Sequence, residues 1–436
     1  MTIATALVDL LAAVLLIIGL LLLSSPRSAR RGNWIAAAGM ILAVAWTVVV
    51  LRGSFTPAGI TICVAGVVIG GFAGTVGART VKMTAMPQMV ALFNGVGGGA
   101  ASLVALSELL KLAGGLPTFQ TGFPEVFALI IGGISFSGSM IAFAKLQELM
   151  TGTPITYPGQ HVVNGLLALI ILVLAGVLLT VTGSVVVLIF LIILALVLGV
   201  LFVLPIGGAD MPVVISLLNA CTGLAVAASG FALDNFALIV AGTLVGASGT
   251  LLTKLMSDAM GRSLANVLFG AFGRVQVSTG AAQGNRAVRA GSADDIGTML
   301  AYSRSVIIIP GYGLAVAQGQ HVLRELADLL EKRGVEVTYA IHPVAGRMPG
   351  HMNVLLAEAN VPYEQLKEMD EINDEFKQAD VALVVGANDV VNPAARNSPG
   401  SDIYGMPILN ADQARNVVFL KRSMRPGFAG IDNELL

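Results

Sequence analysis

The amino-acid sequence predicts a polytopic, all-α membrane domain followed by a soluble α/β domain with a parallel sheet. Three observations support this fold class. Of the 436 residues, 56% are hydrophobic and only 12% are charged, whereas a soluble domain carries about a quarter charged residues. Apolar stretches of membrane-spanning length follow one another as far as residue 256. Beyond residue 291 the charges return, and β-branched runs alternate with amphipathic stretches.

Each apolar stretch is close to the ~20 residues that a helix needs to cross a bilayer. We expect about nine transmembrane helices, at Ile3–Leu23, Trp34–Leu51, Gly59–Val76, Pro87–Leu112, Pro124–Phe143, Val162–Val181, Val185–Leu204, Met211–Phe231 and Phe236–Met256. The first run lacks a preceding basic segment and is too long for the core of a signal peptide. It is therefore expected to be a membrane span of the mature protein.

Three regions follow from this pattern: a transmembrane domain at residues 1–256, a polar Gly- and Ala-rich linker at 257–290, and a soluble domain at 291–436. The net charge is −1 and the chain has no basic block, so a nucleic-acid partner is not expected. The two cysteines, Cys63 and Cys221, lie inside apolar runs. They exclude a disulfide framework.

Basic residues are distributed unevenly among the predicted loops. The basic loop positions are Arg27, Arg30 and Arg31 after the first span, Arg79 and Lys82 after the third, Lys145 after the fifth, and Lys254, Arg262 and Arg274 after the ninth. With nine spans, all of them lie on one side of the membrane. Because cytoplasmic loops are enriched in Lys and Arg, we expect the N-terminus outside and the soluble domain in the cytoplasm.

The segment from Ser305 to Gln318 has the pattern of a nucleotide-binding turn. A β-branched run ends in a glycine turn, and the amphipathic stretch Leu314–Arg333 follows. Gly311 allows the tight turn, and Gly313 lets the backbone approach a pyrophosphate at a helix N-terminus. The third glycine of the fingerprint is replaced by Val316, so an ordinary strand-to-helix turn is the alternative.

Further strands are predicted at Val335–Ile341, Val381–Val385 and Val417–Leu420, and they complete a Rossmann-like pattern. The apolar face of the amphipathic stretch is expected to consist of Leu323, Leu326, Leu329 and Leu330.

The end of the second strand bears on the choice of nucleotide. An NAD-binding unit usually has Asp or Glu there to bind the ribose 2′-hydroxyl, but this strand ends in Ile341-His342-Pro343. The missing acid favours a 2′-phosphate and therefore NADP(H). Lys421, Arg422 and Ser423 follow a later strand and match a dianion. The alternative for this triplet is a solvated strand end.

Two loops have unusual compositions. Residues His342–His351 contain two prolines, two glycines, Arg347 and two histidines. Residues Gly386–Pro393 follow a predicted buried strand, at the carboxyl edge where such sheets bind ligands. Asp389 lies in this second loop, and its alternative role is to cap a helix.

Taken in order, these segments closely resemble the NADP(H)-binding domain of proton-translocating NAD(P) transhydrogenases. The segments that carry the resemblance are Gly311–Gln318, His342–Ala359, Glu368–Asn373, Gly386–Asp389 and Lys421–Ser423. Together they cover nearly all of Gly291–Leu436. In the membrane half, Lys82–Pro87 and Gly207–Asn219 are similar to the membrane part of the family's beta subunit.

The resemblance implies a set of nucleotide-binding residues. These are Gly311, Tyr312, Gly313, Leu314, Ala315, Val316, Ala345, Gly346, Arg347, Met348, Gly386, Ala387, Asn388, Asp389, Val390, Asn392, Lys421, Arg422, Ser423, Gly427, Phe428 and Ala429. It further implies that the Gly386–Asn392 loop lies by the nicotinamide half, that Lys421–Ser423 hold the 2′-phosphate, and that Gly427–Ala429 belong to a lid. No metal site is expected.

The resemblance also implies the partners. An alpha subunit would carry the NAD(H) domain and further transmembrane helices and deliver hydride directly, in the Si-Re specific type of reaction. Two copies of each subunit set would assemble in a bacterial inner membrane. The sequence agrees with a missing half, because it contains one dinucleotide fingerprint and a hydride exchange between NAD(H) and NADP(H) needs two sites.

One departure from the family concerns the proton. Where many relatives carry a membrane histidine, this chain has Asn94. The four histidines, His161, His321, His342 and His351, lie outside the predicted span interiors. Because asparagine takes up no proton near neutral pH, the path is expected to use water or a group of the partner.

Polar residues at membrane depth are candidates for function. Asn94, Asn219, Ser139 and Ser248 are predicted to line a proton path, and Asp210 to couple the membrane domain to the soluble domain. For the serines, the alternative is hydrogen bonding between helices. For Asp210, the alternative is a helix cap.

The activity expected from the resemblance is hydride transfer from NADH to NADP⁺ as protons enter the cell, which makes NADPH. Two other classes of membrane protein are alternatives. A nucleotide-gated ion transporter would need a selectivity filter or broken-helix repeats, and the sequence shows neither. A membrane NADPH dehydrogenase would need paired histidines in the spans or a flavin site, and the predicted span interiors contain no histidine.

Overall fold

The computed structural model describes residues 3–436 apart from 52, 54–55, 83–84, 112–117, 152–153, 182, 208–209, 261–262, 270–289, 347–349, 399–402, 424–426 and 428–430. The chain forms two compact units. The first consists of Met1–Val81, Gln88–Pro205 and Val214–Leu252. The second consists of Thr253–Leu436 together with the short segments Lys82–Pro87 and Ile206–Val213.

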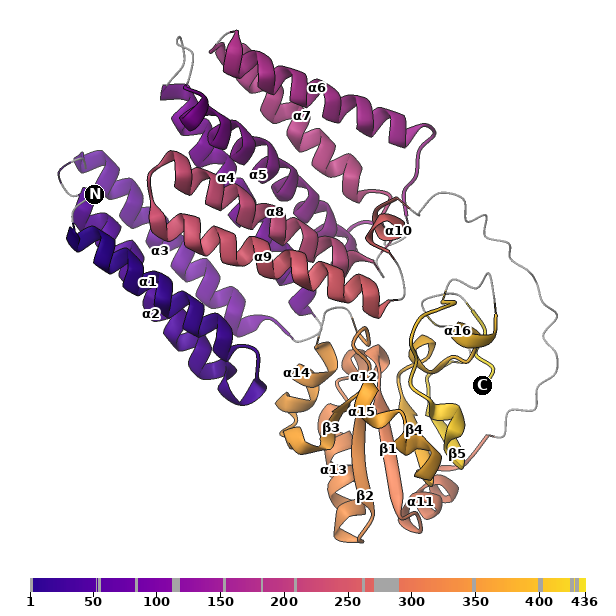
Figure 1. The fold of residues 1–436 in the computed structure, drawn as a ribbon. Coiled ribbons are helices and arrows are strands. Elements are labelled where there is room, and N and C mark those ends of the chain that lie inside the picture. The colour runs from indigo at the N-terminus through magenta and orange to yellow at the C-terminus, as the bar shows by residue number, and fades with distance from the viewer. Residues whose placement is uncertain are drawn as a thin grey trace. The chain divides into compact units, whose positions relative to one another are not determined.

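Long helices make up the first half of the chain (Figure 1). They are α1 (Ile3–Leu22), α2 (Pro26–Leu51), α3 (Pro57–Thr80), α4 (Met86–Lys111), α5 (Phe119–Leu146), α6 (Gln160–Thr180), α7 (Val185–Val203), α8 (Met211–Ala232) and α9 (Phe236–Ala259). Within the described residues, nine helices are long and apolar enough to cross a membrane. The predicted spans are therefore confirmed.

Several of these helices are longer than the apolar stretches that predicted them. α2 begins at Pro26 rather than Trp34, and α5 runs from Phe119 to Leu146. A hydropathy pattern marks the part of a helix that lies in lipid, whereas backbone hydrogen bonds continue the helix into the polar region. The added N-terminal part of α2 contains the basic residues Arg30 and Arg31.

Glycines bring the membrane helices close together. α4 and α5 cross at Gly98 and Gly132, where a Cβ on Gly98 would lie 3.0 Å from the Gly132 carbonyl oxygen. α8 and α9 meet in the same way at Gly223 and Gly242, which leave no space for a side chain. Small residues at such crossings let helices make van der Waals contact along their backbones.

The predicted linker at 257–290 contains one described helix, α10 (Leu264–Phe269). Residues 270–289 lie outside the described part of the chain.

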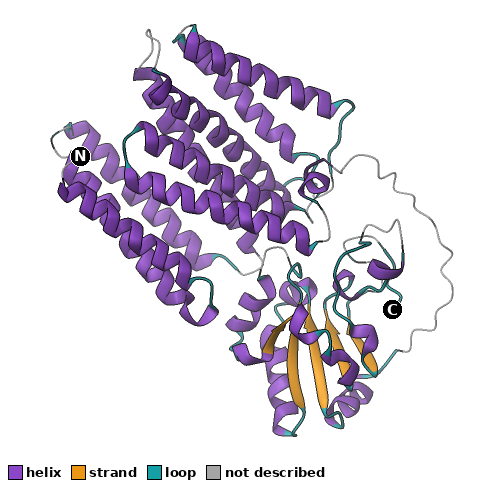
Figure 2. Cartoon of the chain, in the orientation of Figure 1, coloured by secondary structure: helices purple, strands orange, loops and turns teal. Residues whose placement is uncertain are grey.

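The second half of the chain contains a five-stranded parallel sheet in the order β3-β2-β1-β4-β5 (Figure 2). The strands are β1 (Ser305–Pro310), β2 (Glu336–Ile341), β3 (Leu366–Glu368), β4 (Val381–Val385) and β5 (Asn416–Leu420). β1 is central, because Val306 pairs with Val337 of β2 and with Val381 of β4. The helices of this part are α11 (Ala293–Ala301), α12 (Tyr312–Ala317), α13 (Gln320–Lys332), α14 (His351–Glu358), α15 (Met369–Ile372) and α16 (Ala394–Asn397).

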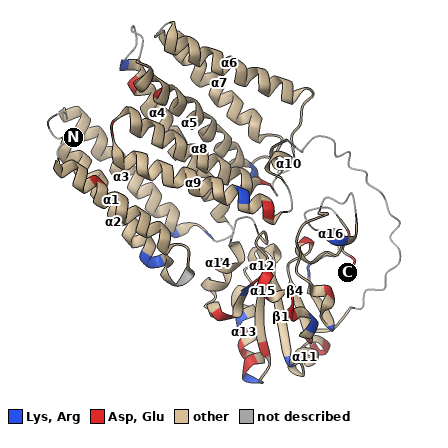
Figure 3. Ribbon diagram, in the orientation of Figure 1, with Lys and Arg blue, Asp and Glu red and all other residues tan. Residues whose placement is uncertain are grey.

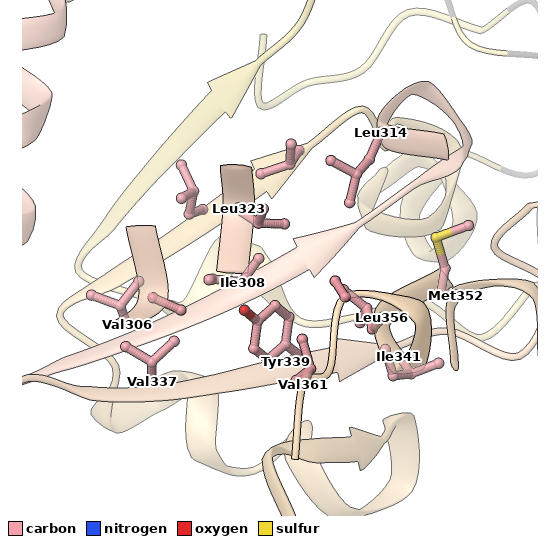
Figure 4. Packing of buried hydrophobic residues seen from close by; sticks show 14 of the residues in the cluster. Val306, Ile308, Leu314, Leu323, Val337, Tyr339, Ile341, Met352, Leu356 and Val361 are labelled. Atoms are coloured by element: carbon pink, nitrogen blue, oxygen red, sulfur yellow. The ribbon is translucent and has the colours of Figure 1, made fainter. Parts of the chain in front are cut away.

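A hydrophobic core forms on each face of the sheet. On one face, Ile308, Tyr339 and Met352 are completely buried among the side chains of α13 and α14 (Figure 4). On the other face, Phe376 and Leu409 pack against Ile309 and Val384. Charged side chains are frequent in this half of the chain and sparse on the long helices (Figure 3). This contrast agrees with a membrane part and a soluble part.

Three details of this half differ from the sequence prediction. The amphipathic stretch Leu314–Arg333 forms two helices, α12 and α13, because Gln318 adopts a left-handed conformation with φ 51°. The short strand β3 was not predicted. Leu329 is 59% exposed and is not part of the buried face, which is formed by Leu323 and Leu330 with Leu326 partly buried.

Candidate nucleotide site and buried membrane cluster

Two of the predicted nucleotide-binding loops lie against each other at the carboxyl edge of the sheet. The Gly311 N–H donates to the Val385 carbonyl at 2.9 Å, and the Gly313 N–H donates to the Gly386 carbonyl at 2.8 Å. Neither Gly311 nor Gly386 has space for a Cβ, and Gly386 has a φ of 68° that favours glycine. The turn after β1 and the loop after β4 therefore form one rigid edge.

This packing explains why the turn after β1 contains glycines. A side chain at Gly313 would lie 2.8 Å from the Gly386 Cα. Leu314 and Ala315 are buried in the core, whereas Val316, at the position of the third fingerprint glycine, is 55% exposed. The missing third glycine is accommodated because the side chain at this position points away from the core.

The loop after β2 is held by a buried histidine. His342 is 1% exposed, and its Nε2 is 2.8 Å from the Pro407 carbonyl oxygen. The Val344 N–H donates to Nδ1 at 3.2 Å, so Nε2 carries the proton and donates to Pro407. Burial lowers the pKa of His342 to about 4, and the bond to Pro407 opposes this effect. The ring is therefore neutral and ties this loop to the segment before β5.

The second histidine of this loop is also buried. The His351 ring lies 6.1 Å from the Tyr312 ring, and Gly346, with a φ of 109°, fits against His351. The loop after β2 is thereby packed on the glycine turn. Ala345 and Gly346 are described in this position, whereas Arg347 and Met348 lie outside the described residues.

The loop after β4 is tied to the C-terminal segment of the chain. Asn392 is completely buried, and its Nδ2 donates to the Asp432 carbonyl at 3.2 Å. Asn433 is 5% exposed and donates from Nδ2 to the Asn388 carbonyl at 3.1 Å. The role of Asn433 was not predicted, since nothing in the surrounding sequence marks it.

Lys421 and Gly427 meet the same loop. With its amide oxygen turned toward them, Asn388 accepts hydrogen bonds from the Lys421 ammonium at 3.0 Å and the Gly427 N–H at 2.6 Å. A side chain at Gly427 would collide with the Asp389 carboxylate. Burial lowers the pKa of Lys421, and the charge of Asp389 opposes this effect. Three segments that are distant in sequence thus converge around Asn388 and Asp389.

The remaining predicted residues of this site are placed as follows. Asp389 is the first residue of a 3-10 turn whose cap position is taken by Asn388. Ala387 is buried, and Val390 packs partly against the core. Arg422 and Ser423 are exposed at the end of β5. Phe428 and Ala429 lie outside the described residues.

These residues fit a 2′-phosphorylated dinucleotide. The side chain that follows β2 is the neutral, hydrogen-bonded His342, so no carboxylate stands at the position that would bind a ribose 2′-hydroxyl. Arg422 and Ser423 are exposed side chains next to Lys421, and together they supply two cations and a hydroxyl.

The membrane helices contain a buried polar cluster. Asn94 of α4 donates from Nδ2 to the Ser139 Oγ at 2.8 Å and to the Ser135 Oγ at 3.3 Å, both on α5. Ser135 donates to the Leu218 carbonyl of α8 at 2.8 Å and lies 2.6 Å from the Thr222 Oγ. Asn94, Ser135, Ser139 and Thr222 are each at most 8% exposed. The cluster joins α4, α5 and α8.

One hydrogen-bond acceptor of this polar cluster is unsatisfied. The Asn94 Oδ1 is buried and has no hydrogen-bond partner among the residues that the structure describes. Thr222 was not predicted, although it lies on α8 one turn after Asn219, and this spacing places both on one side of the helix. Asn219 is half-buried.

The other predicted membrane residues lie apart from these contacts. The Ser248 hydroxyl donates to the Val245 carbonyl of its own helix at 3.2 Å. Ser216 donates to the Gly249 carbonyl at 3.1 Å and joins α8 to α9. Asp210 is half-buried and directly precedes α8.

The fold and these sites define a multi-pass membrane protein with a Rossmann-like nucleotide domain. The family model of the NAD(P) transhydrogenase beta subunit matches residues 5–436. Two proteins of Rhodospirillum rubrum, both named NAD(P) transhydrogenase subunit beta, are 50% identical to this chain over 440 residues, which cover 98% of this chain and 92% of each relative. The chain therefore belongs to the NAD(P) transhydrogenase beta subunit family.

Membership confirms the resemblance inferred from the sequence motifs. The family is one of nicotinamide-nucleotide transhydrogenases, and a beta subunit implies an alpha subunit as its partner.

We predict that His342 makes the stability of fragment Gly291–Leu436 depend on pH. Its folded-state pKa of about 4 lies below the usual 6.5, so the unfolded chain takes up the proton first as the pH falls. The contribution is complete above pH 6.5 and is lost between pH 6.5 and 4, which amounts to about 3 kcal/mol. Urea unfolding across this range measures it.

His342→Gln should lose this part of the pH dependence, while His321→Gln on the exposed side of α13 should keep it. Identical pH profiles for the wild-type and His342→Gln fragments would contradict the assignment.

Proposed function

We propose that this chain is the NADP(H)-binding, proton-conducting subunit of a proton-translocating transhydrogenase. It accepts hydride directly from NADH held by the alpha subunit, and the transfer is coupled to inward proton movement. The observation that carries this proposal is the presence, in one chain, of a nucleotide-type sheet edge and a polar cluster buried among membrane helices. A soluble dehydrogenase has no use for the second feature.

The choice of NADP(H) rests on the two ends of the site. No carboxylate follows β2, where His342 is neutral, and the cationic residues Lys421 and Arg422 follow β5. The nicotinamide half is assigned to the Gly386–Asn392 loop, where Asp389 and Lys421 bring opposite charges close together. Gly427 lies against Asp389, which supports a role for its segment in covering this end.

The membrane part is needed because the chemistry alone has little driving force. NADH and NADPH carry the same nicotinamide ring, and the distinguishing phosphate is remote from it, so hydride exchange is nearly isoenergetic. One proton that crosses about 100 mV supplies ~2.3 kcal/mol. This is enough to shift the NADPH/NADP⁺ ratio roughly fifty-fold. Coupling requires that the soluble unit bind NADP(H) differently in two states.

The orientation and assembly follow from the same scheme. The distribution of the basic loops supports an N-terminus outside and a nucleotide domain in the cytoplasm of a bacterial cell. The alpha subunit supplies the NAD(H) domain, and two copies of each subunit set form the complex. Asp210 directly precedes α8. Because α8 and α9 cross the membrane in opposite directions, α8 begins at the membrane face where α9 ends and the chain continues into the soluble unit. Asp210 is therefore suited to couple the two parts.

In this scheme, Asn94 orients the groups that donate protons along the path. Its Nδ2 is held by Ser135 and Ser139, so its Oδ1 is fixed and offers an acceptor within the membrane. A protonatable side chain on a transmembrane helix of the alpha subunit, or water that it binds, would donate to this oxygen. Asn219, one turn from Thr222, lines the same path. Ser248 is the weaker candidate, because its hydroxyl is bonded within its own helix.

We predict that fragment Gly291–Leu436 binds NADP(H) much more tightly than NAD(H). Lys421→Ala combined with Arg422→Ala should lower the affinity for NADP(H) by about a hundredfold or more, because two charge-assisted hydrogen bonds are lost. Isothermal calorimetry measures both nucleotides.

The matched control is Lys332→Ala with Arg333→Ala, an exposed Lys-Arg pair at the end of α13, before the amino end of β2. Equal affinity of the wild-type fragment for NADP(H) and NAD(H) would remove this part of the proposal.

We predict that Asp389→Asn in the complex impairs coupled turnover by about tenfold or more, which corresponds to about 1.4 kcal/mol of lost transition-state stabilisation. Removing its charge also withdraws the interaction that opposes the lowering of the Lys421 pKa by burial. Thermal unfolding should change little, and Asp370→Asn in α15 serves as an exposed control. Normal turnover by the Asp389→Asn complex would leave Asp389 with a structural role alone.

We predict that Asn94→Leu combined with Asn219→Leu slows proton movement by about tenfold or more and leaves the NADP(H) affinity of the soluble fragment unchanged. Proton uptake into vesicles that contain the complex measures the first quantity. Thr250→Val is the control, because in the described part of the chain its hydroxyl donates to the Gly246 carbonyl of its own helix.

Deleting the membrane segment of the alpha subunit should abolish proton movement while the soluble domains still exchange hydride. Full-rate proton uptake by the Asn94→Leu, Asn219→Leu variant would contradict a path along these two residues.

A further inference from the structure

An acidic side chain that the proposed function does not use is buried in α5. Glu125 is 2% exposed, and neither of its carboxyl oxygens has a hydrogen-bond partner among the residues that the structure describes. A polar group buried in this way costs stability. Intramembrane carboxyl groups are rare and are associated with function.

The surroundings of Glu125 are largely apolar. The adjacent Val126 and Leu129, one turn further along, belong to a hydrophobic cluster that α5 shares with α4, α6, α7 and α8. The charged neighbours on α4 are Glu108 and Lys111, which form an ion pair at 2.5 Å and act on Glu125 through space. Lys111 is therefore already neutralised by Glu108, and Glu125 has no cation of its own in the described surroundings.

A second unsatisfied group lies toward the same end of the helix bundle. Ser229 of α8 is 3% exposed, and its hydroxyl has no hydrogen-bond partner among the described residues. Because α8 crosses the membrane in the direction opposite to α5, the last turns of α8 and the first turns of α5 are at the same side. A carboxyl and a hydroxyl that both lack protein partners are suited to hold water.

Glu125 is in line with the polar cluster around Asn94. Glu125, Gly132 and Ser139 follow one another at seven-residue intervals on α5, and this spacing places them on one side of the helix. Between them, Ser102 of α4 donates to the Leu129 carbonyl at 3.0 Å. At 1.5 Å per residue, Glu125 lies about 21 Å along the helix from Ser139. The line therefore extends over most of the thickness of a bilayer.

The direction of α5 assigns a side to Glu125. α5 and α9 cross the membrane in the same direction, since both are odd-numbered crossings. The start of α5 is therefore at the membrane face opposite to the one where α9 ends and leads into the nucleotide-binding unit. If the nucleotide domain is cytoplasmic, Glu125 is near the outer face.

We propose that Glu125 is a proton-loading site at the outer end of the translocation path. This assignment rests on the proposed transhydrogenase function. The carboxylate takes a proton from hydronium in the outer aqueous phase, which forms one O–H bond and leaves a water molecule. The same O–H bond then breaks as the proton passes to water leading to Asn94. Glu125 thus gives this chain a proton carrier of its own, although no histidine is present in the interior of its predicted spans.

The test uses the whole complex, with its alpha subunit, in sealed vesicles. Glu125→Gln keeps the shape of the side chain but carries no proton, and Glu125→Asp restores an acid. Proton uptake is followed with a pH-sensitive dye, and thermal unfolding of the complex shows that each variant is folded. Glu108→Gln combined with Lys111→Gln is the matched control, since it removes the neighbouring ion pair on α4 as a whole and leaves no unpaired cation beside Glu125.

The proposal predicts that Glu125→Gln lowers proton uptake by at least about tenfold and that Glu125→Asp recovers most of it. The Glu108→Gln, Lys111→Gln control should behave like the wild type. In infrared difference spectra, a carboxyl C=O band that responds to nucleotide should be present in the wild type and absent from Glu125→Gln. Wild-type uptake by Glu125→Gln overturns the proposal, as does equal loss in the Gln and Asp variants, which would indicate a structural role. A wild-type complex that moves no protons overturns the transhydrogenase scheme itself.

Discussion

The organisation of the membrane half depends on one constraint: lipid offers no hydrogen-bond partners, so a polar side chain must find them in its own helix or on a neighbouring one. Such contacts need helices that approach closely, and the glycines provide this. Gly98 and Gly132 allow α4 and α5 to touch through their backbones. Asn94, one turn before Gly98, is thereby brought within hydrogen-bond distance of Ser135 and Ser139. The satisfied donors fix the orientation of the Asn94 oxygen, and an oriented acceptor is what a proton path requires.

The same kind of close approach builds the nucleotide site. Gly311 and Gly313 pack on Gly386, so that the turn after β1 and the loop after β4 hold each other through backbone hydrogen bonds. Asn388 and Asp389 then follow on a fixed support, against which Lys421, Gly427 and the Asn433 segment are placed. A site built in this way from three distant segments responds as a unit when one of them moves. This is a suitable basis for two nucleotide-binding states of different affinity.

Much of this architecture could be predicted from the sequence, because long apolar runs and β-branched runs have characteristic lengths. The membrane spans and the strands β1, β2, β4 and β5 were found in this way. The three-residue strand β3 is too short to leave a pattern, and the break at Gln318 depends on a local left-handed conformation. Thr222, Asn433 and Glu125 escaped notice because their importance lies in contacts, or missing contacts, with other segments. In addition, one glutamate does not change the apolar pattern of the stretch that predicts α5, so Glu125 does not stand out in the sequence.

The central claim is that hydride exchange at the nucleotide site and proton movement through the helices are one process. The most direct measurement is the rate of NADH-dependent reduction of an NADP⁺ analogue by the purified complex in sealed vesicles. We expect this rate to rise when a gradient drives protons toward the face that carries the nucleotide domains. A protonophore should return the rate to its basal value. A rate of hydride transfer that does not respond to the gradient, in vesicles shown to hold it, would contradict the account.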